Sequence, residues 1–338
     1  MKHFQLLLIF CLPLLLLTGC AASGSSREFF AMDTVMQATA YGSGADDALQ
    51  AAEEEIYRLE QLFSCQASEA ELARCNRAGQ LTVSAETAAL VQTALDLSEA
   101  TGGAYDPTLY TLSLAWGFSG GAYRVPDAEE LRSLLAVTGA SRVSVNGCRV
   151  TLQPGTQLDL GGIAKGYAAD VLRAQLEEEG VTSAALDLGG DVFVMGQKTD
   201  GSDWRIAVKD PADTESYLGI VSAADKFIVT SGVYERYFEE NGVRYHHILD
   251  PKTGCPAESG LVSVTVLCEN GAWADALSTA CFVLGPDGAL TLRGDLADQG
   301  TNFELILVTD DGRVLYTDGL ADAFMPNDES GYTYEALT

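Results

Sequence analysis

Residues 158–167, Leu-Asp-Leu-Gly-Gly-Ile-Ala-Lys-Gly-Tyr, constrain the fold most, because they combine a strand end, a double-glycine turn, a lysine and a helix start. Glycine adopts backbone conformations that other residues avoid, and a helix N-terminus presents free N–H groups with a positive partial charge. This arrangement suits a phosphate or pyrophosphate group. Its spacing matches neither the dinucleotide fingerprint nor the P-loop. Taken alone, a tight strand-to-helix connection with a solvated lysine is the simpler interpretation.

The composition restricts the class of protein. The chain has 338 residues, of which 47% are hydrophobic and 20% charged, so it can bury a substantial core in one large domain or two joined lobes. A formal net charge of −28 argues against nucleic-acid binding. An anionic substrate would therefore need a local cation, from Lys165 or from a bound metal.

Residues 1–19 have the pattern of a secretory signal peptide. Their apolar stretch, residues 4–17, is shorter than the roughly twenty residues of a membrane-spanning helix. It ends in Leu-Thr-Gly-Cys, which resembles a bacterial lipobox, although an ordinary signal peptide with a chance cysteine gives the same pattern. We expect lipidation of Cys20, a flexible tether over residues 20–28, and anchoring to the cell membrane on its extracytoplasmic side.

Six cysteines follow Cys20, without a C-x-x-C pair or a repeating interval. This pattern indicates neither a zinc site nor a dense disulfide scaffold. We expect most of them to be buried apolar side chains. A single bridge, such as one between Cys65 and Cys75, is left open by the sequence.

Hydrophobic periodicity predicts several consecutive strands mixed with a few helices. Helices are predicted over 46–63, 84–100, from 127 onward, 165–179, and 272–284, the last ended by Gly285 and Pro286. Strands are predicted over 29–41, 184–188, 192–195, 204–208, 227–230, 245–249 and 261–267, with hairpins at 143–150 and 303–316. This order argues for an α+β fold rather than a doubly wound parallel sheet.

Asp275, Ser278 and Thr279 share one face of the predicted helix 272–284. Such hard oxygen donors suit Mg²⁺, which takes few protein ligands and fills its shell with water and phosphate. A solvated helix edge, or hydroxyls bonded back to the preceding turn, would explain the same residues. The helix alone therefore does not decide between a metal site and an ordinary surface.

Two other polar segments are candidates for a site. Asp106, in Gly-Gly-Ala-Tyr-Asp-Pro, is either a turn residue or a ligand, and residues 187–191 form either a simple turn between strands or part of a site. His246 and His247 are adjacent, and neighbouring strand residues point to opposite faces, so at most one of them faces a given site.

Taken together, these segments resemble the FAD:protein FMN transferase family, known as the ApbE family. The match extends over nearly the whole mature chain, and both the order and the spacing of the segments agree. The matching segments are 32–34, 102–107, 116–118, 159–167, 187–191, 230–232, 247–254 and 274–279.

The resemblance implies an α+β, ApbE-like (T-fold-related) single globular unit of two lobes, with the flavin nucleotide cleft between them. It places this unit at 29–325 and leaves an acidic tail at 326–338. Members of the family move FMN from FAD onto a threonine or serine hydroxyl of a client protein, release AMP and need Mg²⁺. The implied partners are client flavoproteins, such as redox-complex subunits or extracellular flavin-dependent reductases.

The resemblance also implies roles for individual residues. Catalytic roles fall on Lys165, Asp275 and His247, the last as a base whose ordinary pKa near neutrality suits proton transfer. Metal ligation falls on the Gly162 carbonyl, Asp275, Ser278 and Thr279. Contacts to FAD fall on Met32, Gln66, Ala104, Tyr105, Asp106, Asp159, Lys165 and Ile248.

Two positions depart from the family pattern. Asp33 stands where the family has glycine in Met-Gly-Thr, and Gln66 stands where it has a tyrosine beside the flavin. The second change removes an aromatic partner and predicts altered flavin binding. An FAD-binding or FAD-hydrolysing lipoprotein without a client, which would release FMN and AMP, is the main alternative. A solute-binding lipoprotein for a non-flavin ligand is a third.

Overall fold

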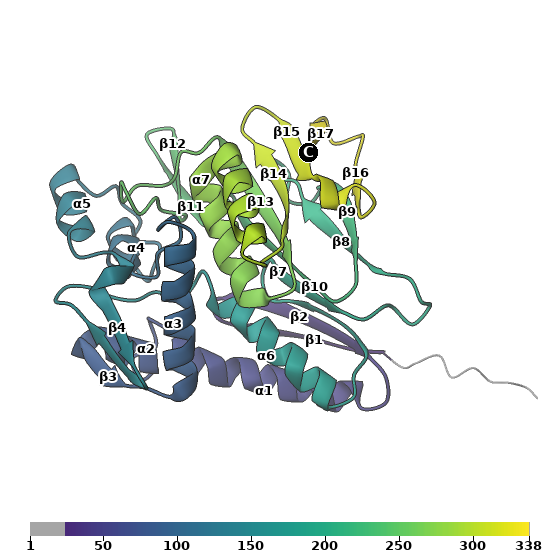
Figure 1. The fold of residues 1–338 in the computed structure, drawn as a ribbon, viewed down its shortest axis with the longest axis horizontal. Helices are drawn as coiled ribbons and strands as arrows, with labels where there is room; N and C mark the ends of the chain where they lie inside the picture. The colour runs from purple at the N-terminus through teal and green to yellow at the C-terminus, as the bar shows by residue number, and fades with distance from the viewer. Residues whose placement is uncertain (1–23, 338) are drawn as a thin grey trace, which may run out of the picture.

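The computed structural model describes residues 24–337, and a nine-stranded sheet forms its centre (Figure 1). All neighbouring strands of this sheet are antiparallel except the last pair, which is parallel. In spatial order the strands are β1 (Gly24–Ala31), β2 (Thr34–Tyr41), β6 (Ser183–Asp187), β7 (Asp191–Met195), β10 (Lys226–Gly232), β13 (Leu261–Cys268), β14 (Glu304–Thr309), β15 (Arg313–Thr317) and β17 (Thr333–Leu337).

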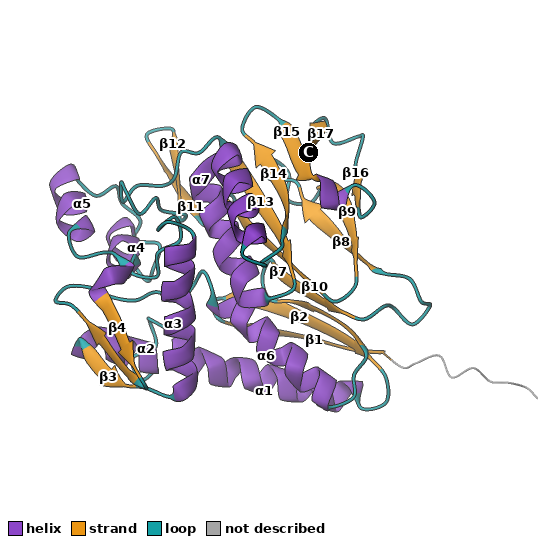
Figure 2. Ribbon diagram, in the orientation of Figure 1, coloured by secondary structure: helices purple, strands orange, loops and turns teal. Residues whose placement is uncertain are grey.

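Three smaller sheets and seven α-helices complete the described fold (Figure 2). The small sheets are β16 (Phe324–Pro326) with β9 (Tyr217–Ala223) and β8 (Trp204–Lys209); β3 (Gln80–Thr82) with β5 (Arg149–Leu152) and β4 (Val143–Asn146); and β11 (Tyr237–Glu240) with β12 (Val243–His246). The helices are α1 (Ala45–Phe63), α2 (Glu71–Ala78), α3 (Ala85–Ala100), α4 (Tyr110–Trp116), α5 (Ala128–Leu135), α6 (Ala164–Glu178) and α7 (Gly271–Asp298), with 3₁₀ turns at Ala140–Arg142 and Asp318–Leu320.

Part of the central sheet is buried on both faces, because successive side chains of a strand point to opposite sides. In β10, Phe227 and Val229 join the large core that includes α1, α6 and α7, whereas Ile228 joins a second core with β8 and β9. Helices therefore cover one face of the central sheet, and the small sheet β16-β9-β8 covers part of the other face. The α+β class expected from the sequence is confirmed.

Helices α6 and α7 cap each other at their N-termini. The Asp170 carboxylate on α6 accepts hydrogen bonds from the backbone N–H groups of Gly271 (2.8 Å) and Ala272 (2.9 Å). In return, Asp275 on α7 accepts one from the N–H of Gly166 (3.1 Å). These donors have no partner within their own helices, so each carboxylate satisfies groups that the helix start leaves unpaired.

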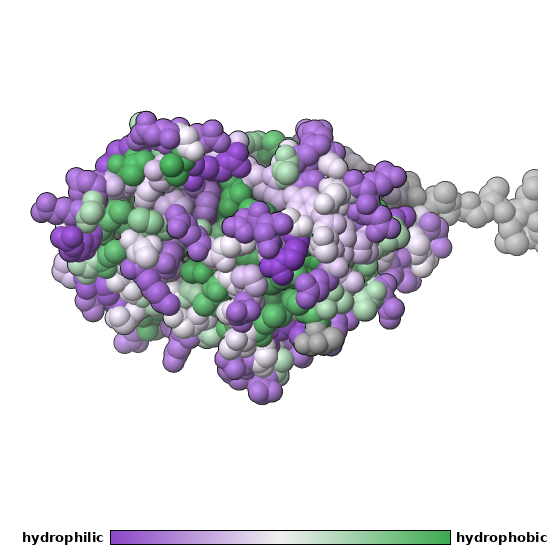
Figure 3. Space-filling model, turned by 90° about the horizontal axis from the view of Figure 1, so that it is seen from above, coloured by the Kyte–Doolittle hydropathy of each residue, from purple (hydrophilic) through white to green (hydrophobic). Residues whose placement is uncertain are grey.

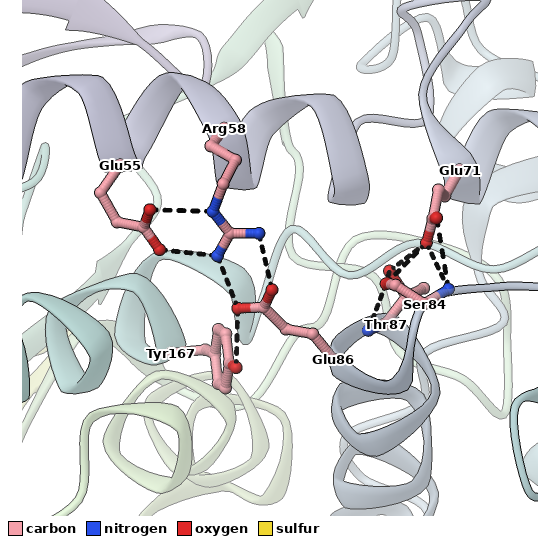
Figure 4. Close-up of polar contacts among 7 residues, drawn as sticks. All are labelled: Glu55, Arg58, Glu71, Ser84, Glu86, Thr87 and Tyr167. Carbon is pink, nitrogen blue, oxygen red and sulfur yellow. Dashed lines mark hydrogen bonds and ion pairs between the residues drawn. The ribbon is translucent and has the colours of Figure 1, made fainter.

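A second polar cluster fixes α1, α3 and α6 relative to one another (Figure 4). Arg58 on α1 donates to Glu86 on α3 at 2.7 and 2.9 Å, and the Tyr167 hydroxyl on α6 donates to the same carboxylate at 3.1 Å. The hydrogen bonds from Arg58 lower the pKa of Glu86 below its ordinary value. Close by, Glu71 on α2 accepts from Ser84, the residue that caps α3.

Several predicted elements are confirmed: the helices 46–63, 84–100 and 165–179 correspond to α1, α3 and α6, and the hairpin 143–150 corresponds to β4 and β5. The single strand predicted over 29–41 is wrong. Met32 and Asp33 adopt positive φ values of 47° and 64° and turn the chain between β1 and β2. Neither residue is a glycine, the residue that most readily adopts positive φ, so local sequence did not indicate this turn.

The predicted end of a helix at Gly285 is confirmed, but a second helical segment that was not predicted follows it. Gly285 leaves the helical region (φ 73°, ψ 179°), but the chain resumes a helix at once and α7 continues to Asp298. Pro286 stands at the start of this second segment, where its missing N–H removes no helical hydrogen bond. The strand predicted over 245–249 instead ends at His246.

The described strands extend beyond the boundaries 29–325 that the resemblance implied for the globular unit. Strand β1 begins at Gly24, inside the expected tether 20–28, and β17 pairs with β15 inside the expected acidic tail 326–338. All six cysteines from Cys65 to Cys281 are free, so a bridge between Cys65 and Cys75 is not formed.

Hydrophilic residues cover most of the face seen in Figure 3 and separate the hydrophobic ones into small patches. No helix within residues 24–337 is long and apolar enough to cross a membrane. The expected signal peptide and Cys20 lie outside the described residues.

We expect Gly166→Ala to lower the free energy of unfolding by about 3 kcal/mol, because overpacking a close backbone contact forces the two helices apart. A Cβ atom at Gly166 would lie 2.1 Å from the carbonyl oxygen of Gly271. Urea unfolding followed by circular dichroism measures the change. Gly294→Ala is the matched control: no atom lies within 4 Å of its added Cβ, and helix propensity predicts a gain of up to about 1 kcal/mol. Equal effects of the two substitutions would contradict the close packing of α6 against α7 at Gly166 and Gly271.

Candidate functional site

A cleft of about 1270 Å³ opens between the central sheet and the lobe that carries α3 to α5. Its walls come from the end of α1, the loop after α3, the start of α6 and the ends of β2, β6, β7 and β10. All the residues to which the resemblance assigns FAD contacts line this cleft, together with His247. They are Met32, Gln66, Ala104, Tyr105, Asp106, Asp159, Lys165 and Ile248.

Lys165 and Asp191 form a buried ion pair in the cleft. The Nζ atom of Lys165 lies 2.8 Å from Oδ1 of Asp191, whose side chain is only 3% exposed. Burial alone lowers the pKa of the Lys165 ammonium, but the Asp191 and Asp275 carboxylates raise it above its ordinary value, so the lysine stays charged. The second oxygen of Asp191 is buried without a hydrogen-bond partner in the described structure.

Asp275 and Thr279 both line the cleft from α7, as the helical spacing predicted. Asp275 is buried, and one of its oxygens caps α6, so it does not belong to a solvated helix edge. Ser278 differs. It does not line the cleft; its hydroxyl donates to the Asp275 carbonyl (2.8 Å) and lies 2.7 Å from the Ser231 hydroxyl. Its geometry is that of a hydroxyl bonded back to the preceding turn, rather than that of a metal ligand.

Gly162 lies beside Thr279 and Tyr105. A Cβ atom built on Gly162 would lie 3.6 Å from the Thr279 hydroxyl oxygen and 3.3 Å from the Tyr105 ring. The absence of a side chain thus lets the backbone before α6 approach the residues of α7. The carboxylate of Asp275, the hydroxyl of Thr279 and the Gly162 backbone together offer hard oxygen donors of the kind that Mg²⁺ binds.

Asp106 and Asp159 shape the loops of the cleft wall. Asp106 accepts hydrogen bonds from the backbone N–H (2.8 Å) and hydroxyl (2.6 Å) of Thr108, so it is a turn residue that also faces the cleft. Asp159 accepts from the backbone N–H of Gly161 at 2.8 Å and holds the double-glycine turn. Burial raises the pKa of both carboxyl groups above their ordinary values.

The two histidines point to different surroundings, as predicted. His247 lines the cleft and its Nδ1 atom is buried without a partner, whereas Nε2 of His246 lies 3.2 Å from the Ala257 carbonyl oxygen. Burial, reinforced by Arg236, lowers the pKa of His247 from its ordinary value near neutrality to about 3. His247 is therefore neutral at physiological pH, and a base of so low a pKa accepts a proton only weakly.

Three residues of the cleft were missed by sequence reasoning. Asp191 lies in the segment 187–191, but nothing in the sequence showed that it would pair with Lys165. Glu235 lines the cleft, where partial loss of hydration raises its pKa above the ordinary value. Arg236 forms an ion pair with Asp33 at 3.2 Å, which gives the unusual residue at that position a partner across the cleft. These pairs join segments far apart in the chain, so local patterns carried no signal for them.

Comparison with known proteins agrees with this geometry. The model of the ApbE family matches residues 32–300. The chain is 33% identical over 321 residues to the FAD:protein FMN transferase of Treponema pallidum, with 88% of each chain covered. It is 36% identical over 285 residues to the FAD:protein FMN transferase of Klebsiella pneumoniae, with 82% of this chain and 86% of the relative covered.

Solved structures give the same result. The ApbE protein of Thermotoga maritima superposes with a TM-score of 0.82 at 34% identity, covering 88% of this chain and 98% of the other. The flavinyl transferase ApbE of Pseudomonas stutzeri superposes with a TM-score of 0.76 at 31% identity, covering 90% and 94%. The chain belongs to the ApbE family.

Proposed function

We propose that this protein transfers FMN from FAD to a threonine or serine hydroxyl of a client flavoprotein and releases AMP. It matches proteins named FAD:protein FMN transferase over most of their length. The observation that carries the proposal is the Lys165–Asp191 ion pair, which lines a cleft large enough for a dinucleotide together with Asp275 and Thr279. Because the protein has a net charge of −28, a bound pyrophosphate needs a local cation, and Lys165 supplies one.

The donor set also supports a Mg²⁺ site formed by Asp275, Thr279 and the Gly162 carbonyl, with the unpartnered oxygen of Asp191 as a further acidic group nearby. When bound, Mg²⁺ supplies Lewis-acid stabilisation of a phosphoryl oxygen and neutralises part of the pyrophosphate charge. Ser278 is left out of this set because its hydroxyl is already bonded to Ser231 and Asp275.

In the proposed reaction the client hydroxyl attacks the phosphorus of the FMN half. A P–O bond to the threonine oxygen forms, the bond to the AMP phosphate breaks, and the hydroxyl proton passes to His247. Lys165 offsets the charge of the phosphates. The negative charge of a bound pyrophosphate would raise the low pKa of His247 towards the range in which a base works well. A client held in line gains an entropic advantage that water lacks.

We expect Asp275→Asn to reduce FAD turnover by roughly 100-fold or more, because the loss of a metal ligand's charge removes several kcal/mol of transition-state stabilisation. Asparagine keeps an oxygen that can still cap α6. The control is Asp170→Asn, which changes the equivalent cap on α7 but lies outside the cleft. AMP release is measured with and without added Mg²⁺ and chelator. Full activity of Asp275→Asn, or of the parent protein in excess chelator, would refute the metal site.

The reaction itself is tested with FAD, Mg²⁺ and a peptide that bears the acceptor threonine of a family client, followed by mass spectrometry. We expect the peptide to gain the mass of FMN less water. His247→Ala should slow this gain roughly 10²- to 10⁴-fold, the usual contribution of a general base. His246→Ala should leave the chemistry nearly unchanged, because that side chain faces away from the cleft. FAD consumption at equal rates with and without peptide, and no adduct, would indicate the hydrolase or carrier alternative.

We further propose that the protein is a lipoprotein anchored to the outer side of the cell membrane. The lipobox-like sequence ending at Cys20 supports this location, as does the Ser/Gly-rich stretch after it. We expect Cys20→Ala to move the protein from the membrane fraction to the soluble fraction, as measured by fractionation and immunoblotting. Mass spectrometry of the parent checks for the acyl group. An unmodified Cys20 in a parent that fractionates like the variant would rule out the anchor.

A further inference from the structure

The cleft extends past the Lys165 region and along strand β8. Its floor there is the face of β2 and β6 that carries Gln37, Thr39 and Ala185, and its wall is β8. Residues Arg205, Ala207 and Lys209 all line this part, and all three are exposed. Their spacing of two places their side chains on the same side of the strand. We call this part of the cleft the β8 groove.

Strand β8 forms one edge of its sheet. The sheet order is β16-β9-β8, and β8 pairs only with β9 among the described strands. An edge strand presents unpaired N–H and C=O groups along its free side, which can accept an additional strand from another chain. Binding of this kind takes affinity from the main chain and specificity from alternate side chains.

The charges in the β8 groove contrast with the rest of the protein. Neither Arg205 nor Lys209 forms an ion pair or a side-chain hydrogen bond within residues 24–337, although acidic side chains outnumber basic ones by 48 to 20 in the whole sequence. The other two cations of the cleft are already paired, Lys165 with Asp191 and Arg236 with Asp33. The β8 groove therefore offers two unused positive charges on a free strand edge.

The β8 groove is continuous with the chemistry. Lys209, Glu235 and Lys165 all line the same cleft, and the charges of both lysines act to lower the pKa of the Glu235 carboxyl. A chain bound along β8 would thus run towards the Lys165–Asp191 pair.

We propose that the β8 groove binds the client's acceptor segment as an extended, acidic strand added to the free edge of β8, with Arg205 and Lys209 contacting its carboxylates. This inference rests on the proposed function and adds the site and the charge of the client segment. It also gives the acidic enzyme a way to attract a partner that its overall charge would repel.

The test uses two fluorescein-labelled peptides of equal length with a central threonine. One carries Asp and Glu on both sides of that threonine, and the other carries Asn and Gln at the same positions. Fluorescence anisotropy measures their binding to the parent, to the double variant Arg205→Glu/Lys209→Glu, and to a control, Arg132→Glu/Lys252→Glu. The control changes two exposed cations that lie outside the cleft.

We expect the parent and the control to bind the acidic peptide about tenfold more tightly than the amide peptide, with the preference shrinking as salt increases. The Arg205→Glu/Lys209→Glu variant should lose the preference and still bind FAD with the affinity of the parent. Equal binding of both peptides by the parent, or an unchanged preference in the variant, would overturn the proposal. A variant that loses FAD affinity instead would assign these cations to the nucleotide and overturn it as well.

Failure of the proposed function has a different signature. If the parent prefers the acidic peptide but attaches no FMN to any hydroxyl peptide, peptide binding in the β8 groove is supported and the transferase reaction is refuted.

Discussion

The mutual capping of α6 and α7 is the interaction on which both the fold and the site depend. Each helix start leaves N–H groups unpaired, and each helix supplies the carboxylate that the other needs. The glycines at the crossing let the two backbones touch. Because Asp275 both caps α6 and lines the cleft, its position in the cleft is held by the same contact that holds the two helices together.

The electrostatics around Lys165 follow from the carboxylates that surround it. A lysine buried among carboxylates keeps its proton, because its neighbours compensate for lost hydration. The same surroundings leave Asp191 with an unsatisfied oxygen, an expensive state for a buried polar group. The protein's own groups therefore compensate the buried charge of Asp191 only in part.

Sequence reasoning succeeded where structure is local. The amphipathic helices α1, α3 and α6 and the spacing of Asp275 and Thr279 all follow from helical periodicity. It failed where tertiary contacts decide. The turn at Met32 and Asp33 uses two residues that seldom adopt positive φ, and β17 forms only because β15 offers it an edge. The low pKa of His247 depends on burial, and Ser278 turned inwards because Ser231 lies opposite.

The free cysteines have a practical consequence. Burial raises the pKa of the Cys65, Cys75, Cys268 and Cys281 thiols, so these groups remain protonated, and the thiolate is the form that oxidants and alkylating agents attack. With no disulfide within residues 24–337, the folded domain draws none of its stability from an oxidant. A thiol reductant can therefore be present during purification without breaking a structural crosslink of the described domain.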